Sequence, residues 1–556
     1  MKRYAMAGLL CAACGLAAAQ TSEELLNPSQ NLENVLHLGA GYDLKMFSPL
    51  KQITKSNVRR LVPIWNFITA NDMGELSQPT VYNGVMYVVN GNWTFAIDVA
   101  TGRQIWRTPA NYDRGALRIG SAGAFLRGAA AIYNGKLFRQ NIDGHVVALD
   151  MKTGKEVWKE KFGEWKESYI GVIQPMIVNG VLINHMAGGD RTARGFVEGY
   201  DPDTGKRLWR TWTRPAPGEK GSETWPNKEM PDAWKYGGGA TWQAGSYDPE
   251  LDLYYVGTGN AQPYNPKYRM GMDSLFAATQ LAIRPKTGEL VWHYQYVPND
   301  SFDFDGSQES ILADVRIDGK PRKVLFNANK NGFLYVLDRT NGQLISARPF
   351  TNQNWAKEID LKTGRPVLTD LLERAINGET VEMNPARATN ATLSAYNPKT
   401  GLMFLNSWEA IRVMKFVDVK LVIGAGYTGI QTSFKNPPKG EPLAYSIAIN
   451  PVTGKVAWKN PIYDYGISAG TLATDSGLLF TGRLTGEVVA LDQDTGKQLW
   501  QFKTGSSVNA PPITYTHKGV QYVTVLSGRG GSNPNRSAGA VVPTGGSVWT
   551  FALMPE

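Results

Sequence analysis

An eleven-residue phrase recurs along this 556-residue chain and constrains its fold more than any other feature. The copies are AIDVATGRQIW (96–106), ALDMKTGKEVW (148–158), GYDPDTGKRLW (199–209), AIRPKTGELVW (282–292), AINPVTGKVAW (448–458) and ALDQDTGKQLW (490–500). A weaker copy, VLDRTNGQLIS (336–346), lacks the final tryptophan. Each copy predicts a strand, a turn and a second strand, because Asp or Asn followed by Thr-Gly is typical of a hairpin turn whose glycine has a positive φ.

The spacing of these phrases indicates one repeating unit. Gly102 and Gly154 are 52 residues apart, and Gly154 and Gly205 are 51 apart. Two wider gaps each contain a further hairpin pattern, SYDPELDLYYVGTG and AYNPKTGLMFLN. A unit of roughly 40–50 residues with four strands is typical of a propeller blade. We therefore predict an all-β fold, an eight-bladed β-propeller.

The last blade is predicted from APPITYTHKGVQYVTVLSG and SVWTFALMP, completed by the N-terminal segment near LVPIWNF. A solenoid or several small barrels would also explain repeats. Ring closure is favoured because it leaves no long sheet edge exposed after the C-terminal strands.

The first twenty residues, MKRYAMAGLLCAACGLAAAQ, predict a secretory signal peptide. A charged start is followed by an apolar run and by small residues suited to cleavage after Ala19, so we expect a signal at 1–19 and one propeller domain at 20–556. Lipid attachment at Cys14 is an alternative, although CAAC lacks the leucine usual in such a motif. No later stretch is apolar enough to span a membrane.

Both cysteines, Cys11 and Cys14, lie in this segment. The mature chain therefore has no disulfide, no thiolate zinc site and no haem attached through a C-x-x-C-H motif. The net charge of +9 falls to +7 without Lys2 and Arg3. This mild basic excess contains no basic run, so it favours solubility and not nucleic-acid binding.

The repeats and several local motifs resemble the quinoprotein alcohol dehydrogenases of the methanol/ethanol dehydrogenase family, which depend on pyrroloquinoline quinone (PQQ). The repeated D-x-x-T-G-x-x-x-W phrase resembles their tryptophan-docking motif. The similarity runs from near residue 41 to the final strand and includes GTGNAQPYN (257–265), WHYQYVPNDSFDFDG (292–306), NANKNGFLYVLDRTNG (327–342), GTLATDSGLLFTG (470–482) and VLSGRGG (525–531). The resemblance implies a periplasmic enzyme that holds PQQ beside one metal ion, Ca²⁺ or a lanthanide.

Two carboxylates stand two positions apart in PNDSFDFDGSQES (298–310). If this stretch is extended, Asp303 and Asp305 leave the same side of the backbone, and their charges repel unless a cation lies between them. The resemblance implies that Asp303 is the catalytic base, taking the alcohol proton while hydride passes to the quinone. It also implies that Asp305 is a metal ligand typical of lanthanide-dependent members, since a trivalent hard cation gains from another anionic oxygen. Alternatively, Asp305 makes only a turn hydrogen bond.

The resemblance implies further site residues. Asn260 in GTGN would be an amide metal ligand. Asp190 in AGGDRTARGF stands where the family has a glutamate ligand, and its side chain is one methylene shorter than that glutamate. Trp242 would form the floor under PQQ. Lys330 would stabilise charge developing on the quinone oxygens, as a catalytic and cofactor-binding residue.

Two more contacts with PQQ are expected from the resemblance. Arg127 in FLRGAA would pair with a PQQ carboxylate, which suits a bidentate guanidinium. Glu75 in MGELSQP would also contact PQQ, although it lies one position off the family pattern.

The departures from the family pattern lie above the expected cofactor. Ser121 and Ala122 stand where the family has adjacent cysteines that form a disulfide, Ser468 replaces a tryptophan, and Asn299 replaces a histidine. A missing disulfide and a missing aromatic wall predict a wider, more polar pocket. We expect a bulky or secondary alcohol as substrate.

Three function classes follow. The first is an alcohol dehydrogenase that passes electrons to a separate soluble cytochrome c, since no haem motif is present. The second is a sugar or polyol quinoprotein dehydrogenase. The third is a non-enzymatic scaffold of the outer-membrane assembly type. Such a scaffold would have no need of the residues Asp303, Asp305, Asn260 and Lys330. The first is favoured; formation of a homodimer remains open.

Overall fold

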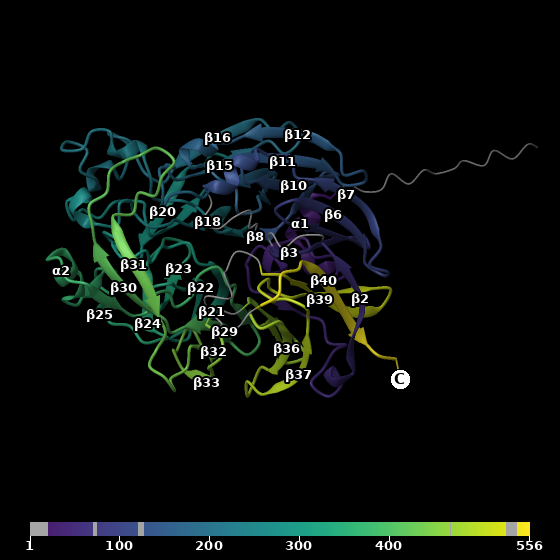
Figure 1. Cartoon of the computed structure of the whole chain (residues 1–556). Coiled ribbons are helices and arrows are strands. Elements are labelled where there is room, and N and C mark those ends of the chain that lie inside the picture. Colours follow the sequence, from purple (N-terminus) through teal and green to yellow (C-terminus); the bar gives the residue numbers. More distant parts are fainter. Residues whose placement is uncertain (1–19, 70–74, 120–126, 467–468, 530–541, 556) are drawn as a thin grey trace, which may run out of the picture.

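The computed structural model describes residues 20–69, 75–119, 127–466, 469–529 and 542–555. The predicted signal peptide (1–19) and residues Ser121, Ala122 and Ser468 lie outside the described residues. The fold is an all-β propeller built from many short antiparallel strands and very little helix (Figure 1).

The described residues form eight sheets of four or five strands. The first four sheets follow each other along the chain. Their strands are β4 (Thr80–Tyr82), β5 (Val85–Val89), β6 (Trp93–Asp98), β7 (Gln104–Pro109); β9 (Ala131–Tyr133), β10 (Lys136–Asn141), β11 (His145–Asp150), β12 (Glu156–Lys161); β13 (Met176–Val178), β14 (Val181–Asn184), β15 (Phe196–Tyr200), β16 (Arg207–Trp212); and β17 (Ser246–Asp248), β18 (Leu253–Gly257), β19 (Thr279–Ile283), β20 (Leu290–Gln295).

The next three sheets continue this order. They contain β21 (Ile311–Ile317), β22 (Lys320–Ala328), β23 (Phe333–Asp338), β24 (Leu344–Pro349); β28 (Ala395–Asn397), β29 (Leu402–Trp408), β32 (Ala444–Ile449), β33 (Val456–Ile462); and β34 (Thr471–Thr474), β35 (Leu478–Gly482), β36 (Glu487–Asp492), β37 (Gln498–Lys503), with β1 (Phe47–Ser48) parallel to β34.

The last sheet joins the two ends of the chain. Strands β38 (Ile513–His517), β39 (Val520–Ser527) and β40 (Ser547–Leu553) are completed by β2 (Leu61–Ile68), which pairs antiparallel with β40. The prediction that LVPIWNF completes the last unit is therefore confirmed.

Smaller elements connect these sheets. They are the pairs β3 (Leu76–Gln78) with β8 (Arg127–Ala129) and β25 (Ala356–Ile359) with β26 (Pro366–Leu368), the sheet of β27 (Val381–Met383), β30 (Ile411–Phe416) and β31 (Ile430–Lys435), the helices α1 (Ser22–Leu26) and α2 (Leu371–Ile376), and the 3₁₀ turns Pro28–Gln30, Leu38–Ala40, Val58–Arg60, Arg114–Arg118, Trp165–Glu167, Ser222–Thr224, Ala233–Lys235 and Pro266–Arg269. No helix of the described segments has the length and apolar character needed to cross a bilayer.

The repeated phrase forms the turn between the third and fourth strands of a sheet. In its first copy, Asp98 Oδ1 accepts hydrogen bonds from the backbone N (2.9 Å) and hydroxyl (2.8 Å) of Thr101, and Gly102 has φ +71°. The closing tryptophan reaches into the next sheet: Trp106 Nε1 donates to the Met151 carbonyl at 3.0 Å. Corresponding indole bonds join Trp65 to Val99, Trp158 to Pro202, Trp209 to Pro285, Trp292 to Arg339, Trp458 to Gln493 and Trp500 to Leu61.

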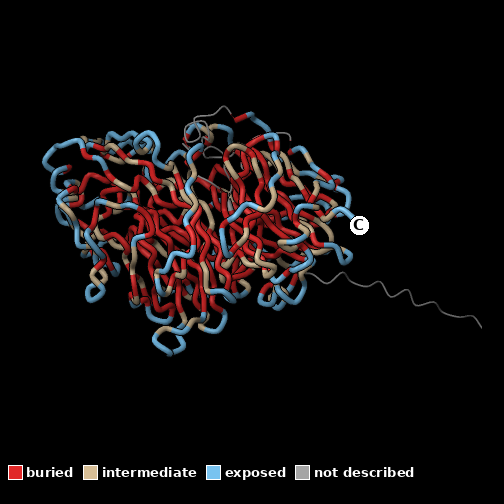
Figure 2. The backbone as a smooth tube through the Cα atoms, turned by 90° about the horizontal axis from the view of Figure 1, so that it is seen from below, coloured by how far each residue is buried: buried red, intermediate tan, exposed pale blue. Residues whose placement is uncertain are grey.

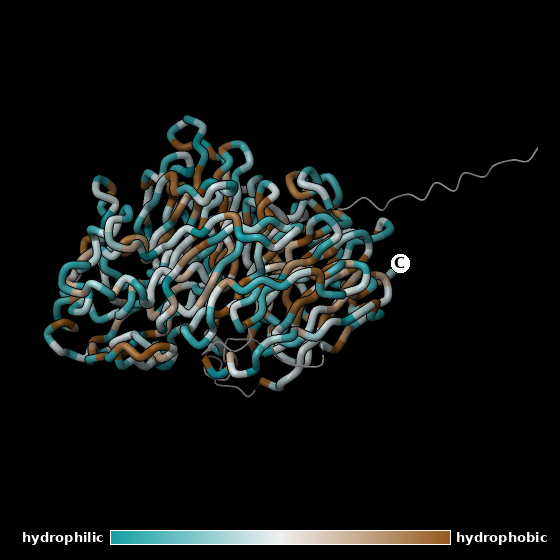
Figure 3. The backbone as a smooth tube through the Cα atoms, turned by 90° about the horizontal axis from the view of Figure 1, so that it is seen from above, coloured by the Kyte–Doolittle hydropathy of each residue, from teal (hydrophilic) through white to brown (hydrophobic). Residues whose placement is uncertain are grey.

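Burial follows this architecture. In Figure 2 buried residues fill the interior of the sheets, while exposed residues lie at the peripheral turns. Figure 3 shows hydrophilic and hydrophobic residues alternating along many strands, as expected when successive side chains point to opposite faces. The packed apolar side chains of the sheets form a core, and the loops at the sheet ends hold polar side chains.

Candidate active site

The predicted site residues lie on connections at one end of the sheets. Asp190 follows β14, Asn260 follows β18 and Lys330 follows β22, and each of these is the second strand of its sheet. Asp303 lies in a connection from a fourth strand, β20, to the next sheet. In an antiparallel sheet the second and fourth strands end at the same edge. The repeated Thr-Gly turns therefore occupy the opposite edge.

These loops enclose a cavity of about 300 Å³. Its wall contains the predicted residues Asp190, Trp242, Asn260, Asp303, Asp305 and Lys330, together with Arg191, Arg387, Asn390 and the apolar side chains of Ile119, Ile170, Val172, Ala187 and Ala240. Six residues predicted from short motifs far apart in the sequence thus face one space.

The loop that carries the two aspartates is not extended. Asp303 and Asp305 have φ of +63° and +62°, so the premise of an alternating strand is wrong. Asp300 holds the loop instead: its carboxylate accepts hydrogen bonds from the backbone N of Phe302 (3.0 Å), Phe304 (2.9 Å) and Asp305 (3.1 Å). Burial, followed by the charge of Asp305, raises the pKa of Asp300 to about 6.

A single ammonium group lies between the two carboxylates. Lys330 Nζ donates to Asp303 Oδ1 at 2.9 Å and to Asp305 Oδ2 at 2.6 Å. Asp303 has a second cation, because Arg412 Nη2 donates to its Oδ2 at 2.6 Å. In this structure the cation that the two aspartates face is therefore Lys330.

The pKa values of the two aspartates are shifted in opposite directions for this reason. Burial opposes ionisation of Asp303, but the charges of Lys330, Arg412 and Arg387 outweigh it and lower the pKa of Asp303 well below its usual range. Among the described residues, Lys330 is the one ion-pair partner of Asp305, and burial with the negative charge of Asp303 raises the pKa of Asp305. Asp303 is thus the carboxylate held ionised, as a proton acceptor requires.

Asp190 and Asn260 contribute oxygen atoms on the other side of the cavity. The Asp190 side chain is exposed, and the surface that it exposes faces the cavity. Desolvation by the surrounding protein and the negative charges of Asp303 and Asp305 raise the pKa of Asp190 to about 6. Asp190 Oδ1 accepts hydrogen bonds from Tyr264 Oη (2.9 Å) and Gln262 Nε2 (3.3 Å). The backbone N of Asn260 donates to Asp305 Oδ1 at 2.8 Å.

The oxygen donors fit a hard cation in chemistry, since carboxylate and amide oxygens are the ligands such ions prefer. These donors are spread apart in this structure: within the described ranges, no three His, Cys, Asp or Glu side chains form a group that could hold a metal ion. Trp242 supplies a partly buried aromatic wall to the same cavity, which suits a flat cofactor.

The other two predicted cofactor contacts, Glu75 and Arg127, are not among the described residues that line the cavity. Glu75 is buried and accepts hydrogen bonds from Thr69 Oγ1 (3.0 Å) and Asn90 Nδ2 (3.4 Å), and it is not among the described residues that line the cavity. The side chain of Arg127 lies outside the described part of the chain; its backbone begins β8.

An insertion between β29 and β32 contacts the loops that carry the site residues. It forms the hairpin of β30 and β31 and a loop that bonds to two distant segments (Figure 1). The backbone N of Tyr427 donates to the Asp190 carbonyl at 3.1 Å, and Gly424 N donates to Thr192 Oγ1 at 2.9 Å. The hairpin also delivers Arg412 to Asp303.

Sequence reasoning missed Asp300, Arg387 and Arg412. Arg412 belongs to no motif, but it alternates in phase with the buried Met414 along β30. This alternation, which places an arginine on the same face of the strand as a core residue, was the one sequence pattern that could have indicated a buried functional arginine. For Arg387 in NPARATN, no comparable pattern exists.

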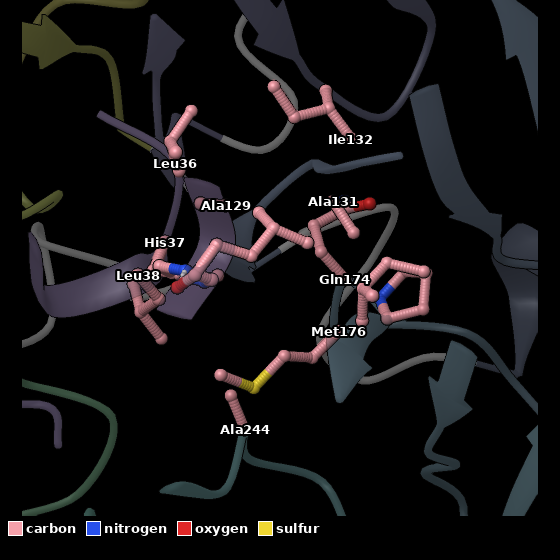
Figure 4. Close-up of a pocket in the computed structure, with 13 residues that line it drawn as sticks. Leu36, His37, Leu38, Ala129, Ala131, Ile132, Gln174, Met176 and Ala244 are labelled. Carbon is pink, nitrogen blue, oxygen red and sulfur yellow. Dashed lines mark hydrogen bonds between the residues drawn. The ribbon is translucent and has the colours of Figure 1, made fainter. Parts of the chain in front are cut away.

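A second cavity, of about 20 Å³, lies near the N-terminal segment. Figure 4 shows His37 and Gln174 among apolar neighbours such as Leu36, Ile132 and Met176. His37 Nε2 bonds to the Leu25 carbonyl oxygen at 2.7 Å. This volume suits a single water molecule and no larger ligand, so this small cavity is not a candidate active site.

Comparisons with known proteins identify the family to which the chain belongs. Residues 37–393 match the family model described as the glucose/ethanol/alcohol dehydrogenase β-propeller domain (PQQ), and residues 445–552 match the model of the outer membrane protein assembly factor BamB. The chain is 39% identical to the quinohemoprotein alcohol dehydrogenase ADH IIB of Pseudomonas putida, over 94% of this chain and 78% of that protein. It is 32% identical to a lanthanide-dependent methanol dehydrogenase of Methylacidiphilum fumariolicum, over 99% and 98%.

Solved structures give the same result. A europium-containing methanol dehydrogenase superposes with a TM-score of 0.89 at 31% identity, over 96% of this chain and all of that one. Because a family model matches more than half of the chain and relatives above 30% identity span nearly all of it, the chain belongs to the PQQ-dependent alcohol dehydrogenases, a family of oxidoreductases.

Proposed function

We propose that this protein is a periplasmic dehydrogenase that uses PQQ and one metal ion to oxidise a bulky or secondary alcohol, and that passes the electrons to a separate cytochrome c. The observation that carries the proposal is the placement of an ionised Asp303 between Lys330 and Arg412 on the wall of the 300 Å³ cavity. We also interpret the eight sheets as eight blades of one ring, held by tryptophan docking.

Each residue then has a defined task. When bound, PQQ supplies a quinone that accepts hydride from the carbinol carbon. Asp303 accepts the hydroxyl proton, and Lys330 places positive charge where negative charge develops. Asp190, Asn260, Asp303 and Asp305 would hold the metal ion, and Trp242 would contact the flat face of the cofactor.

The substrate preference is supported by the sequence above the site. The chain has no cysteine after residue 14, so no disulfide can cover the cavity. The sequence has Ser121, Ala122, Asn299 and Ser468 where the family has adjacent cysteines, a histidine and a tryptophan, and from these replacements we expect a wider, more polar pocket. A sugar or polyol dehydrogenase is the alternative within the same family, whose model names glucose among its substrates.

A non-enzymatic scaffold is the second candidate. Its support is the match of residues 445–552 to the assembly-factor model. That segment contains none of the site residues Asp190, Asn260, Asp303 and Lys330, which favours the enzyme.

The test is reconstitution of the apo-protein with PQQ and either calcium or lanthanum, following dye reduction over primary, secondary and bulky alcohols. We expect lanthanum to support a higher rate than calcium. Asp305→Ala should lower the lanthanum-dependent turnover at least tenfold, and it should also lower the amount of bound lanthanum, measured by mass spectrometry. Equal activity of wild type and Asp305→Ala with calcium would reduce Asp305 to a turn residue. A strong preference for methanol or ethanol contradicts the bulky substrate, and absence of PQQ binding with either metal rejects the enzyme.

A further inference from the structure

Among the described cations on the cavity wall, Arg387 differs from its neighbours because no described residue accepts a hydrogen bond from it. Lys330 is paired with Asp303 and Asp305, and Arg191 Nη1 donates to the Gly424 carbonyl at 2.9 Å. Arg387 lies between β27 and β28 and lines the same cavity. Its Nε has no hydrogen-bond partner in the described part of the chain, and no described carboxylate forms an ion pair with it.

Aromatic rings hold this guanidinium in place. The Arg387 Cζ lies 4.8 Å from the ring centroid of Phe434 and 5.6 Å from that of Trp408. The two rings are packed together, with centroids 5.8 Å apart. Stacking on aromatic faces fixes the plane of an arginine without using its N–H donors. The donors of Arg387 are therefore positioned and left available to a ligand.

The guanidinium lies close to the proposed base. Phe434 also contacts Arg412, with Cζ 5.3 Å from its centroid, and Arg412 is bonded to Asp303. The charge of Arg387 contributes to the ionisation of Asp303, which places the two side chains within electrostatic reach. A substrate hydroxyl bonded to Asp303 would therefore bring the rest of a small substrate near Arg387.

We propose that the alcohol substrate carries a carboxylate or a similar anionic group, and that Arg387 binds this group while Asp303 binds the hydroxyl. The inference rests on the proposed function, because it names the substrate class of the same site. A planar guanidinium fits a carboxylate through two parallel hydrogen bonds. A neutral alcohol would leave these donors without a substrate acceptor, and sites built to bond a polar group discriminate against analogues that lack it.

The experiment compares matched substrates with the PQQ- and metal-loaded enzyme. The pairs are 4-hydroxybutanoate with butan-1-ol and 3-hydroxybutanoate with butan-2-ol, and the measured quantity is the ratio of their kcat/KM values. We expect wild type to favour the hydroxyacid at least tenfold, and Arg387→Gln to lower the ratio by about 10- to 100-fold, since hydrogen bonds to charged groups are the strong ones. Arg387→Lys should retain part of the preference for the hydroxyacid, because lysine keeps the positive charge but cannot form the two parallel hydrogen bonds of a guanidinium.

A binding measurement complements the kinetics. Butanoate, which has no hydroxyl to oxidise, should bind to the loaded wild type in calorimetry and compete with the hydroxyacid, whereas butanamide should not. Arg374→Gln is the matched control: Arg374 is exposed on α2, pairs with Glu379, and should leave the kcat/KM ratio unchanged. If Arg387→Gln does not fold, the inference is still tested by the butanoate titration of wild type and by the ratio of kcat/KM values measured for Arg387→Lys.

Three results would overturn the inference. An active enzyme that prefers the neutral alcohols and does not bind butanoate refutes the anionic substrate and leaves the proposed function standing. An Arg387→Gln variant with weaker PQQ binding and an unchanged ratio assigns Arg387 to a cofactor carboxylate. Absence of turnover of every alcohol together with absence of PQQ binding rejects the proposed function and this inference alike.

Discussion

Three basic side chains determine the state of Asp303. Lys330 and Arg412 contact it directly, and Arg387 acts through space. Arg412 is nearly inaccessible to solvent and also donates to the Phe302 carbonyl at 3.0 Å, so it cannot move away without loss of a buried hydrogen bond. The base is thus fixed in position as well as in charge.

Replacement of this carboxylate by its amide should isolate its chemical role. Asp303→Asn keeps the size of the side chain but removes its ability to accept a proton, so we expect kcat to fall by about 10²- to 10⁴-fold, the range for a general base. Dye reduction measures the rate, and spectroscopic titration should show that PQQ still binds.

Asp494→Asn is the control for this substitution. Asp494 is an exposed residue paired with Lys55, remote in sequence from the site loops. A comparable loss of kcat in this control, or wild-type kcat in Asp303→Asn, would contradict the assignment of the base.

Glu309 is a buried acid whose carboxylate is only half satisfied. Its Oε1 accepts a hydrogen bond from the backbone N of Ser394 at 2.9 Å, while Oε2 has no partner in the described segments. Burial raises the pKa of Glu309 to about 7. The folded protein therefore retains this proton at pH values where the unfolded chain has released it.

This difference makes stability depend on pH with a definite sign. Between the ordinary pKa of about 4.5 and about 7, the unfolded state releases the proton first, so this group makes the protein less stable as pH rises, by a total of about 3 kcal/mol. Glu309→Gln removes the titration, and the stability of the variant relative to wild type should rise from pH 5 to pH 8. Urea unfolding at both values measures it.

The control is Glu289→Gln, an exposed glutamate in a Thr-Gly turn. Its difference from wild type should be the same at pH 5 and pH 8. A Glu309→Gln variant with an equally flat difference would show that Glu309 ionises normally in the folded protein.

At the scale of the element, each Thr-Gly turn is also a packing surface for the neighbouring sheet. Gly154 has φ +71°, and a Cβ there would lie 2.5 Å from Thr108 Oγ1 and 2.6 Å from the Trp106 ring. The absence of a side chain therefore serves both the turn and the docking of the indole. Gly135, in the β9–β10 turn of the same sheet, has φ +76° with nothing near the position of a Cβ.

This pair of glycines separates backbone strain from packing. Gly135→Ala should cost about 1–2 kcal/mol of unfolding free energy, the penalty for an L-residue in the left-handed region. Gly154→Ala should cost about 1–3 kcal/mol more, since overpacking adds to the same strain. Thermal and urea unfolding measure both, and equal losses would show that the Trp106 contact is not tight.

At the scale of the whole molecule, one strand pair joins the beginning of the described chain to its end. Strand β40 pairs with β2 from Leu61↔Leu553 to Ile68↔Ser547 and with β39 on its other side. Its side chains Val548 and Phe551 are fully buried. Without β40, the last sheet would lose its link to the N-terminal segment and leave two exposed sheet edges.

Truncation should expose this dependence. A chain ending at Gly546 lacks β40, and we expect little soluble monomer and no single cooperative unfolding transition. A chain ending at Leu553 retains every described strand and loses the backbone and side-chain bonds between Arg60 and Met554. It should fold nearly as wild type; cooperative unfolding of the shorter chain would refute the role of this strand pair.

The sequence by itself determined the repeating hairpins, the position of their turns and the pairing of LVPIWNF in the last sheet. These features follow from short-range patterns: alternation along strands, Asp and Thr-Gly in turns, and a regular spacing. The resemblance to a family added the candidate residues, and Asp190, Trp242, Asn260, Asp303, Asp305 and Lys330 do meet in one cavity.

Only the tertiary structure decided how those residues interact. It placed Lys330 between Asp303 and Asp305, and it brought Arg412 from a hairpin more than a hundred residues away to complete the charge pattern. Such contacts depend on loop conformation, as in the left-handed backbone of Asp303, and on the distance across the cavity between sheets. Neither leaves a periodic signal in the chain, because each is set by the packing of segments that are remote in sequence.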